Sequence, residues 1–197
     1  FQCEADAEAS WVVGTIHLQE AMGQPYLVRI ELWNLDLAAM PEELLGQNAT
    51  LTLRRTNGVR RFVHGIVRCV EHGASTSRAV AARVELVPAL EALRMTQDSR
   101  IWQNLSVVEV LDAVLGSGLG TYGRELMMVT QRDYPIREYF TQYQETDFDF
   151  CHRLMEEFGL SYHFLHDEEE PERLVAVDTL ADDPHERKCS VLHPGAG

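Results

Sequence analysis

The chain has 197 residues, enough for one domain or two small ones, and 45% of them are hydrophobic, enough for a packed core. Its formal net charge of −14 argues against binding to nucleic acids and to anionic membranes, because both require clustered Lys and Arg. No apolar run approaches the roughly 18 residues of a membrane-spanning helix, and no secretory signal is recognisable at the start. Because the chain begins at Phe1 rather than Met and ends at Gly197, we expect it to be part of a longer protein.

Residues 1–95 are predicted to form a small antiparallel β-barrel. Apolar and polar residues alternate with the period of two that marks a half-buried strand in four segments, at residues 26–33, 49–55, 61–70 and 78–87. Asn57 and Gly58 predict a hairpin turn between the second and third segments, since both tolerate positive φ. Gly65, inside the third segment, indicates a bulge or a bend. A short helical turn is expected at residues 41–45.

Residues 96–180 are predicted to form an α+β subdomain. Ser106 and Glu109 form a capping box that starts a helix near residues 106–116, with Gly116 as its end. Thr146 caps a second helix at 146–158, and Gly159 ends it. Two alternating segments then predict a hairpin at residues 160–178, joined by an acidic loop that starts at Asp167. Residues 181–197 are expected to begin the next segment.

The four cysteines are widely and irregularly spaced, at positions 3, 69, 151 and 189. No Cys-x-x-Cys pair is present, which disfavours a zinc ribbon. Cys69 and Cys151 fall at apolar positions of predicted elements, so we interpret them as reduced thiols in the core. The chain is therefore expected to fold in a reducing compartment.

Histidines and carboxylates near one another in the sequence are candidates for a catalytic or metal site. His152, His163, His166 and Asp167 lie closest together, but a spacing of three places His163 and His166 on opposite faces of a strand. Neither a His-x-His strand motif nor a His-Glu-x-x-His helix motif is present. We predict no metal and no cofactor, and we keep as a low-ranked alternative a hydrolase in which His163 or His166 acts as the base.

An ordered series of motifs runs along nearly the whole chain. Residues 98–103 read DSRIWQ, 106–111 read SVVEVL, 134–139 read YPIREY and 142–150 read QYQETDFDF. Residues 44–46 read LLG, and 62–67 read FVHGIV. This series resembles the valine-glycine repeat (VgrG) spike proteins of type VI secretion systems, whose corresponding motifs include DSRIFQ, SVxEIL, YPPREY and QYxETDxDF.

The resemblance implies a structural component of the secretion spike, similar to the hub of phage baseplates, and not an enzyme. It implies a homotrimer in which barrels of three subunits form a ring that caps a tube of hexameric rings. In that family a second barrel, an oligonucleotide-binding-type domain and a β-helical needle normally follow. Because the second barrel and the needle supply much of the trimer contact, this piece alone is expected to be monomeric or weakly associated. The implied partners are the tube protein and effector or adaptor proteins. The resemblance also implies that the spike assembles in the cytoplasm and is then secreted. Homologous hubs of contractile phage tails and of extracellular injection particles are alternatives.

Five polar or aromatic residues within these motifs are candidates for a contact with a neighbouring subunit or with the tube: Asp98, Arg100, Gln142, Tyr143 and Glu145. Tyrosine is common at the centre of protein interfaces. Local roles are open as well, because Asp98 and Ser99 can cap a turn, Arg100 can pair nearby, and residues 142–147 can pack within the subdomain.

Overall fold

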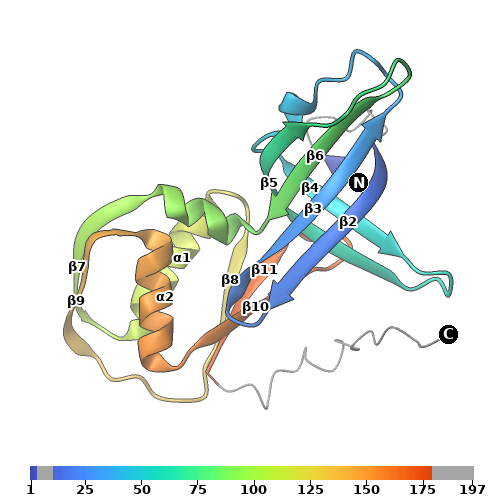
Figure 1. Ribbon diagram of the computed structural model, residues 1–197. Helices are drawn as coiled ribbons and strands as arrows, with labels where there is room; N and C mark the ends of the chain where they lie inside the picture. Colours follow the sequence, from blue (N-terminus) through green and yellow to red (C-terminus); the bar gives the residue numbers. More distant parts are fainter. Residues whose placement is uncertain (4–10, 179–197) are drawn as a thin grey trace.

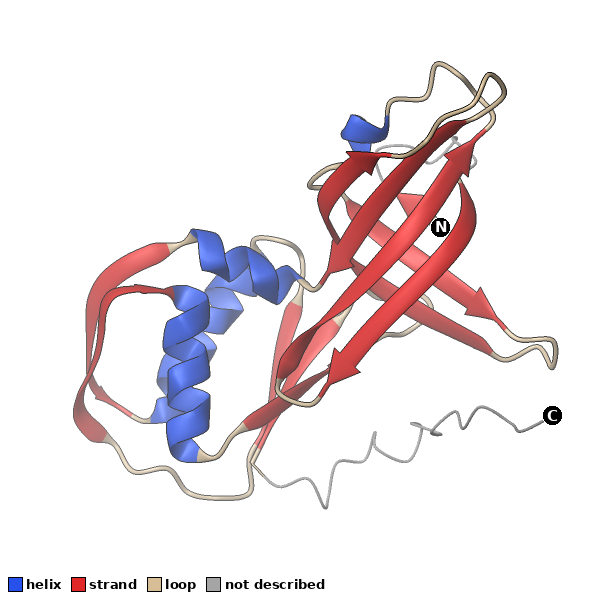
Figure 2. Ribbon diagram, viewed as in Figure 1, coloured by secondary structure: helices blue, strands red, loops and turns tan. Residues whose placement is uncertain are grey.

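The computed structural model describes residues 1–3 and 11–178. A twisted six-stranded sheet lies beside a second group of elements, in which two helices are held between a two-stranded ribbon and a three-stranded sheet (Figure 1). The mixture of helices with mostly antiparallel strands confirms the α+β class (Figure 2). The predicted segment at residues 181–197 and Cys189 within it lie outside the described residues.

The larger sheet has six antiparallel strands in the order β1-β4-β5-β6-β3-β2. They are β1 (Gln2–Cys3), β2 (Val12–Ala21), β3 (Gln24–Asn34), β4 (Asn48–Arg54), β5 (Arg60–His72) and β6 (Val80–Val87). The four alternating segments of the sequence overlap β3 to β6. The predicted turn joins β4 to β5, and Gly58 there has a φ of +86°. The expected helical turn is the 3₁₀-helix η2 (Pro41–Leu44).

The predicted barrel is wrong, because this sheet is open. Its outer strands are β1 and β2, and within the described residues no ladder joins them. A period of two identifies the buried face of each strand, whereas closure depends on the tilt and stagger of all the strands together. Strand β2 is exposed along most of its length, as an edge strand is.

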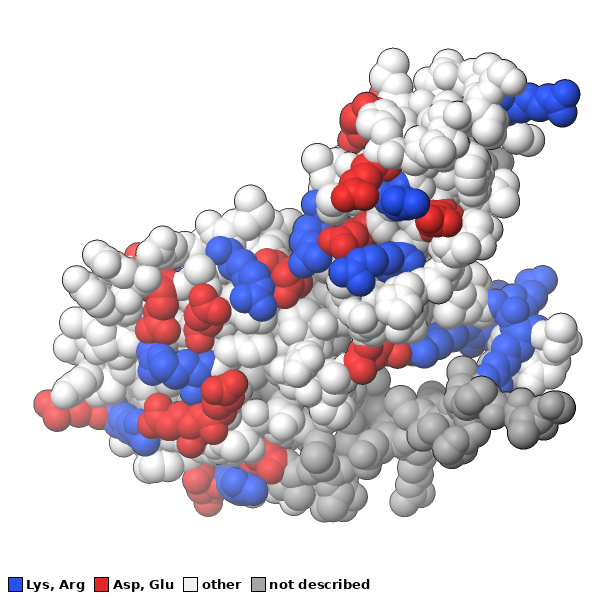
Figure 3. Space-filling view, viewed as in Figure 1, with Lys and Arg blue, Asp and Glu red and all other residues white. Residues whose placement is uncertain are grey.

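The two faces of the six-stranded sheet differ in chemistry. The inner face is apolar and includes Val28, Ile30, Leu32, Leu51, Val63, Val84 and Leu86. On the outer face Arg29 and Arg68 both bind Glu85, and Arg83 binds Glu31. Positive and negative side chains therefore lie next to one another over this sheet (Figure 3). Such exposed pairs add little stability each, but they keep the face polar.

Cys69 is not the core thiol that the sequence predicts. The β5–β6 ladder shifts its register between Val67 and Cys69, and this bulge turns Cys69 to the outer face, opposite Glu85. Cys151 is buried as predicted, and burial raises the pKa of its thiol. Gly65 lies outside the bulge, and it marks a close approach instead, since a β-carbon there would lie 2.5 Å from the backbone oxygen of Val87.

The second group of elements follows the 3₁₀-helix η3 (Ala89–Met95). The ribbon consists of β7 (Gln97–Leu105) and β9 (Arg137–Thr146). The helices are α1 (Val107–Gly120) and α2 (Asp147–Phe158). The small sheet has the strand order β10-β11-β8, with β8 (Glu125–Val129), β10 (Ser161–Leu165) and β11 (Arg173–Val177). In the part of the chain that the structure describes, neither helix has the length and apolarity needed to cross a bilayer.

Both predicted helices are present, but α1 is longer than expected. Its capping box forms, with the Ser106 side chain accepting from the Glu109 amide. The helix continues through Gly116 because Leu119, one turn further along, is fully buried. A β-carbon on Gly118 would lie 3.0 Å from Leu93, so the glycine lets α1 approach η3 closely. Residues 117–120, beyond the predicted end at Gly116, are therefore helical, an example of packing that overrides helix propensity.

Helix α2 and the hairpin after it occur as predicted. Thr146 caps α2, and Gly159 ends it with a φ of +70°. Strands β10 and β11 pair antiparallel, from Ser161 opposite Val177 to Leu165 opposite Arg173. The sequence did not reveal that β11 also pairs with β8, in parallel. Parallel neighbours are joined by long connections, so no short turn signal marks them.

The buried side chains form two clusters. One lies under the six-stranded sheet, and the other is built on the two helices and the small sheet. Phe164 of β10 packs against both clusters. Its ring centroid lies 5.1 Å from that of Tyr26, and the two rings are arranged edge to face. The Gly23 amide, in the turn between β2 and β3, donates to the backbone oxygen of Tyr162 at 2.8 Å. The division of the chain into domains at residues 95 and 96 stays a prediction.

A buried ion pair joins the two groups of elements. Arg124 Nε lies 2.5 Å from Glu172 Oε2, and their side chains are 5% and 2% exposed. Arg124 also donates to the Tyr122 oxygen and to Asn48 Oδ1 of β4. Glu172 accepts from the Ala89 amide, where η3 begins. Both charges are thus paired and hydrogen-bonded, which is the condition under which burial of an ion pair is tolerated.

We expect the loss of either partner of this pair to destabilise the fold strongly. Arg124→Met or Glu172→Gln should lower the free energy of unfolding, measured by urea denaturation, by about 3–5 kcal/mol, because the remaining group is buried without its partner. The matched control is Arg83→Gln, which removes an exposed pair and should cost less than about 1 kcal/mol. Equal, small effects of all three substitutions would contradict the assignment.

Candidate functional site

The five candidate contact residues gather at one end of the β7–β9 ribbon. Asp98 pairs with Glu145 in the ladder, Ser99 with Tyr143, and Arg100 with Gln142. The register shifts between Asp98 and Ser99, so Gln144 is an additional residue on β9 with a φ of +49°. The bulge bends the end of the ribbon, which lies beside the start of α2 at Asp147.

Most of the candidates are bound within the chain. Arg100 Nε donates to Gln142 Oε1 at 3.0 Å, and the same guanidinium pairs with Asp98 and with Asp147, the first residue of α2. Gln142 is almost fully buried and donates to Asp147 Oδ1 at 2.8 Å. These contacts tie the ribbon to the helix, so Arg100 and Gln142 have a clear structural role.

Glu145 and Tyr143 differ in how they are used. Glu145 lies 2.6 Å from Arg153 of α2, in an ion pair that also fixes the ribbon on the helix. Tyr143 is 71% exposed and points away from the helices. Of the five candidates it offers the most free surface to a partner. The contact role of all five stays a prediction.

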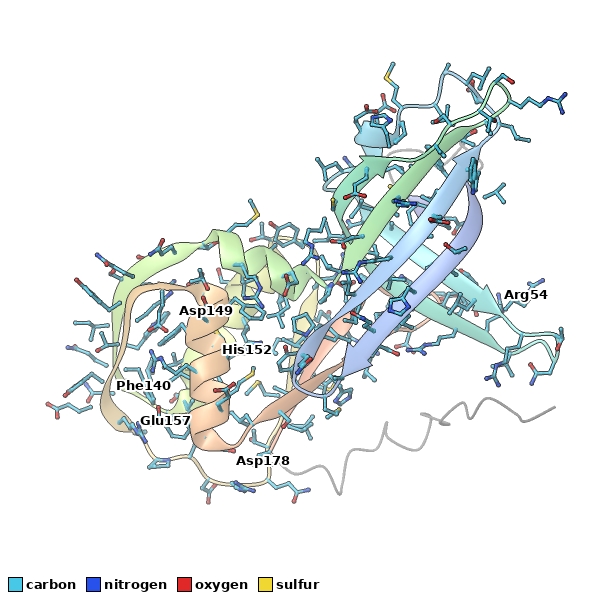
Figure 4. All side chains as sticks on the ribbon, viewed as in Figure 1. Arg54, Phe140, Asp149, His152, Glu157 and Asp178 are labelled. Atoms are coloured by element: carbon cyan, nitrogen blue, oxygen red, sulfur yellow. The ribbon has the colours of Figure 1, made fainter. Side chains whose placement is uncertain are left out.

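Tyr143 belongs to an exposed apolar patch that the sequence analysis missed. Ile101 is 66% exposed and Tyr139 is 61% exposed, and both lie on the same outward face of the ribbon as Tyr143. Phe140 points the other way, toward the helices (Figure 4), and Trp102 packs against the same buried cluster. We call Ile101, Tyr139 and Tyr143 the ribbon face. The alternation from Tyr139 to Tyr143 places both tyrosines on one face of the strand. The pattern does not show which face is exposed, because aromatic residues occur on both faces.

His64, His166 and Asp167 meet where the acidic loop touches β5. The His64 amide donates to His166 Nδ1 at 3.1 Å, and His64 Nε2 lies 2.6 Å from the Asp167 backbone oxygen. His166 Nε2 is buried and has no hydrogen-bond partner among the described residues. Burial is the main cause that lowers the pKa of His166 to about 3, with smaller contributions from His64 and Arg61.

This geometry gives His166 a structural role. An Nδ1 that accepts from a backbone amide holds the ring neutral and fixed, and the Asp167 carboxylate lies 2.5 Å from Arg173, away from the ring contact. His163 lies on β10, in the strand before this loop. Across the described ranges, three or more His, Cys, Asp or Glu side chains nowhere gather closely enough to hold a metal ion.

Comparison with known proteins places the chain in a family. The family model of the phage tail baseplate hub (GPD) matches residues 19–196. The chain belongs to this hub family. The type VI secretion system spike protein VgrG1b of Pseudomonas aeruginosa is 35% identical over 151 residues, which cover 76% of this chain and 20% of the relative. The resemblance to VgrG proteins is thereby confirmed.

A second relative and a solved structure agree with the hub assignment. The actin cross-linking toxin VgrG1 of Vibrio cholerae is 39% identical over 127 residues, which cover 64% of this chain and 11% of the toxin. The c3393 protein of E. coli, described as a component of the type VI secretion system with structural similarity to T4 tail proteins gp27 and gp5, matches with a TM-score of 0.81 and 25% identity. That match covers 90% of this chain and 48% of the other.

The neutral His166 generates a testable dependence of stability on pH. The pKa of His166 is lower in the folded protein than the roughly 6.5 of an unfolded histidine, so the unfolded chain binds more protons and folding weakens as pH falls below that value. In His166→Asn the amide oxygen can still accept from His64, but nothing titrates. Between pH 7 and pH 5, urea denaturation should show a loss in the wild type that is about 1–2 kcal/mol larger than in the variant. Identical losses would contradict the buried, neutral assignment.

Proposed function

We propose that the chain is the front part of the hub of a type VI secretion spike, and that its work is mechanical rather than catalytic. The observation that carries this proposal is the 35% identity to a named spike protein over 76% of the chain. The chain spans only about a fifth of the length of that relative, so the activity of the whole protein rests on segments beyond the match. The fold supports the same role, since the polar and ionisable groups described above are used in internal contacts.

The proposed assembly is a trimer of the longer parent protein. Three hub copies would form a ring on the hexameric tube protein, and effector or adaptor proteins would attach to the spike. The spike would be assembled in the cytoplasm and then carried out of the cell with the tube. The toxin name of the Vibrio cholerae relative, of which the match covers 11%, supports effector activity in parts of such proteins outside the hub.

The ribbon face is our proposed contact between this hub and a neighbouring subunit or the tube. An exposed apolar surface is formed by Ile101, Tyr139 and Tyr143. The two tyrosine rings flank Ile101 and have few rotatable bonds, as in many interface anchors. The backbone beneath them is fixed by the nine-residue β7 and by the ion pairs of Arg100 and Arg153. A rigid, partly apolar face loses little conformational entropy when it is covered.

The assembly is tested by light scattering on the parent protein. We expect a molar mass of three chains, because hub copies must surround the tube axis. The piece with 197 residues should remain a monomer in dilute solution, since much of the trimer contact in the parent is expected downstream of it. A parent protein that is strictly monomeric at micromolar concentration would overturn the proposed function. A gene neighbourhood of capsid genes would instead favour a phage tail hub.

The ribbon face is tested with surface variants of the parent. Tyr139→Ser combined with Tyr143→Ser should leave the free energy of unfolding within about 0.5 kcal/mol of wild type, since both side chains are exposed. The same change should weaken binding between hub copies or to the tube protein by about tenfold or more in a pull-down titration. Leu37→Ser, at another exposed apolar position, is the matched control and should bind as wild type does. Unchanged binding of the double variant would reject the contact.

A further inference from the structure

The tip of the β4–β5 hairpin is basic in a strongly acidic chain. Arg54, Arg55, Arg60 and Arg61 fall within a stretch of eight residues, and they are four of only 17 basic residues in a chain with 31 acidic ones. All four side chains are exposed. The hairpin projects from the body of the protein, and Arg54 lies near its outer end (Figure 4).

The turn that carries these arginines is well ordered. The Gly58 amide donates to the Arg55 oxygen at 3.0 Å, and the Arg55 amide donates to the Val59 oxygen at 2.9 Å. The Val59 amide also donates to Asn57 Oδ1 at 3.1 Å. The backbone that carries these charges is therefore closed into a hydrogen-bonded turn at the end of the hairpin.

The arrangement is unfavourable for the hairpin by itself. Arg54 lies directly opposite Arg60 in the ladder, and like charges in that position repel each other. Arg60 is neutralised by Glu168 at 2.5 Å and Arg61 by Glu20 at 2.5 Å. Within the described residues, neither Arg54 nor Arg55 lies within ion-pair distance of a carboxylate. A fold that needed only its own stability would gain from an acid at either position.

The acidic loop of the same chain supplies the complementary surface. Glu168, Glu169 and Glu170 are consecutive and exposed. Glu168 is taken by Arg60, Glu170 approaches Arg173 only at 3.6 Å, and Glu169 has no ion pair in the described part of the chain. Thus Arg54 and Arg55 keep two unneutralised positive charges, and the loop keeps carboxylates that its own hairpin does not reach.

We propose that Arg54 and Arg55 of one hub copy bind Glu169 and Glu170 of the adjacent copy, so that the hairpin tip links neighbouring subunits. This inference rests on the proposed function, because it requires several copies around one axis. The occupant is a second copy of this chain rather than a nucleic acid, since a net charge of −14 opposes a polyanion while leaving an acidic loop on every neighbour.

The direction in which a charge reversal changes the melting temperature distinguishes this contact from a free hairpin. In a free hairpin, Arg54→Glu with Arg55→Glu removes repulsion at the tip and should raise the melting temperature. In the assembled parent protein we expect the same arginine substitutions to lower the melting temperature by several degrees. Adding Glu169→Arg and Glu170→Arg to that variant should restore the melting temperature. Arg78→Glu, in the loop at the other end of β5, is the control and should leave it unchanged.

Cross-linking tests the proximity directly. Two tagged copies of the parent, one with Arg55→Cys and the other with Glu169→Cys, should give a heterodimeric band with a short bis-maleimide. Arg78→Cys with Glu169→Cys should give none. No band, an unchanged or higher melting temperature of the arginine variant, or no restoration by the reversed loop would each overturn the link. A trimeric parent with any of these results leaves the proposed function intact, whereas a monomeric parent overturns both.

Discussion

The fold depends on one buried ion pair, between Arg124 and Glu172. Four chain segments meet at these two side chains: the start of η3 at Ala89, the turn after α1 at Tyr122, strand β4 at Asn48 and the acidic loop before β11. Because both charges are almost fully buried, the segments that carry Arg124 and Glu172 cannot separate without leaving a charge unpaired in an apolar setting. The pair therefore specifies one relative position of the six-stranded sheet and the helices.

Other polar contacts hold the same junction. The Gly23 amide meets β10, and His64 meets the loop that carries His166. Each depends on geometry as well as on apolar area, since a backbone amide must face its acceptor at hydrogen-bond distance. The acceptor is the Tyr162 backbone oxygen for Gly23 and the neutral His166 Nδ1 for His64. Many of the ionisable groups of the described residues are used in such contacts within the chain.

The sequence predicted what local chemistry controls. The capping residues Ser106 and Thr146 begin helices, Gly159 ends one, and Asn57 with Gly58 forms a turn. It failed where distant contacts decide. Gly116 does not end α1, because burial further along the helix outweighs its low propensity. The open sheet and the parallel β8–β11 pair depend on which strands meet in space, and a period of two does not contain that information.

The candidate site shows the same division. Asp98, Arg100, Gln142, Tyr143 and Glu145 were chosen from the motifs, and the structure does bring them to one end of a ribbon. Their individual roles could not be predicted, because the direction of each side chain depends on the β7–β9 register and on the bulge at Gln144. Ile101 and Tyr139 became visible as a surface only when the two strands were paired.

The position of β11 between β10 and β8 has a consequence for synthesis of the protein. The six-stranded sheet is complete once residue 87 has been made, so it can form while later residues are still being translated. Strand β8, by contrast, must wait for residues 173–177, and Arg124 waits with it for Glu172. Such non-local pairing slows folding. Docking of β11 therefore follows synthesis of the six-stranded sheet, and it brings Glu172 to Arg124.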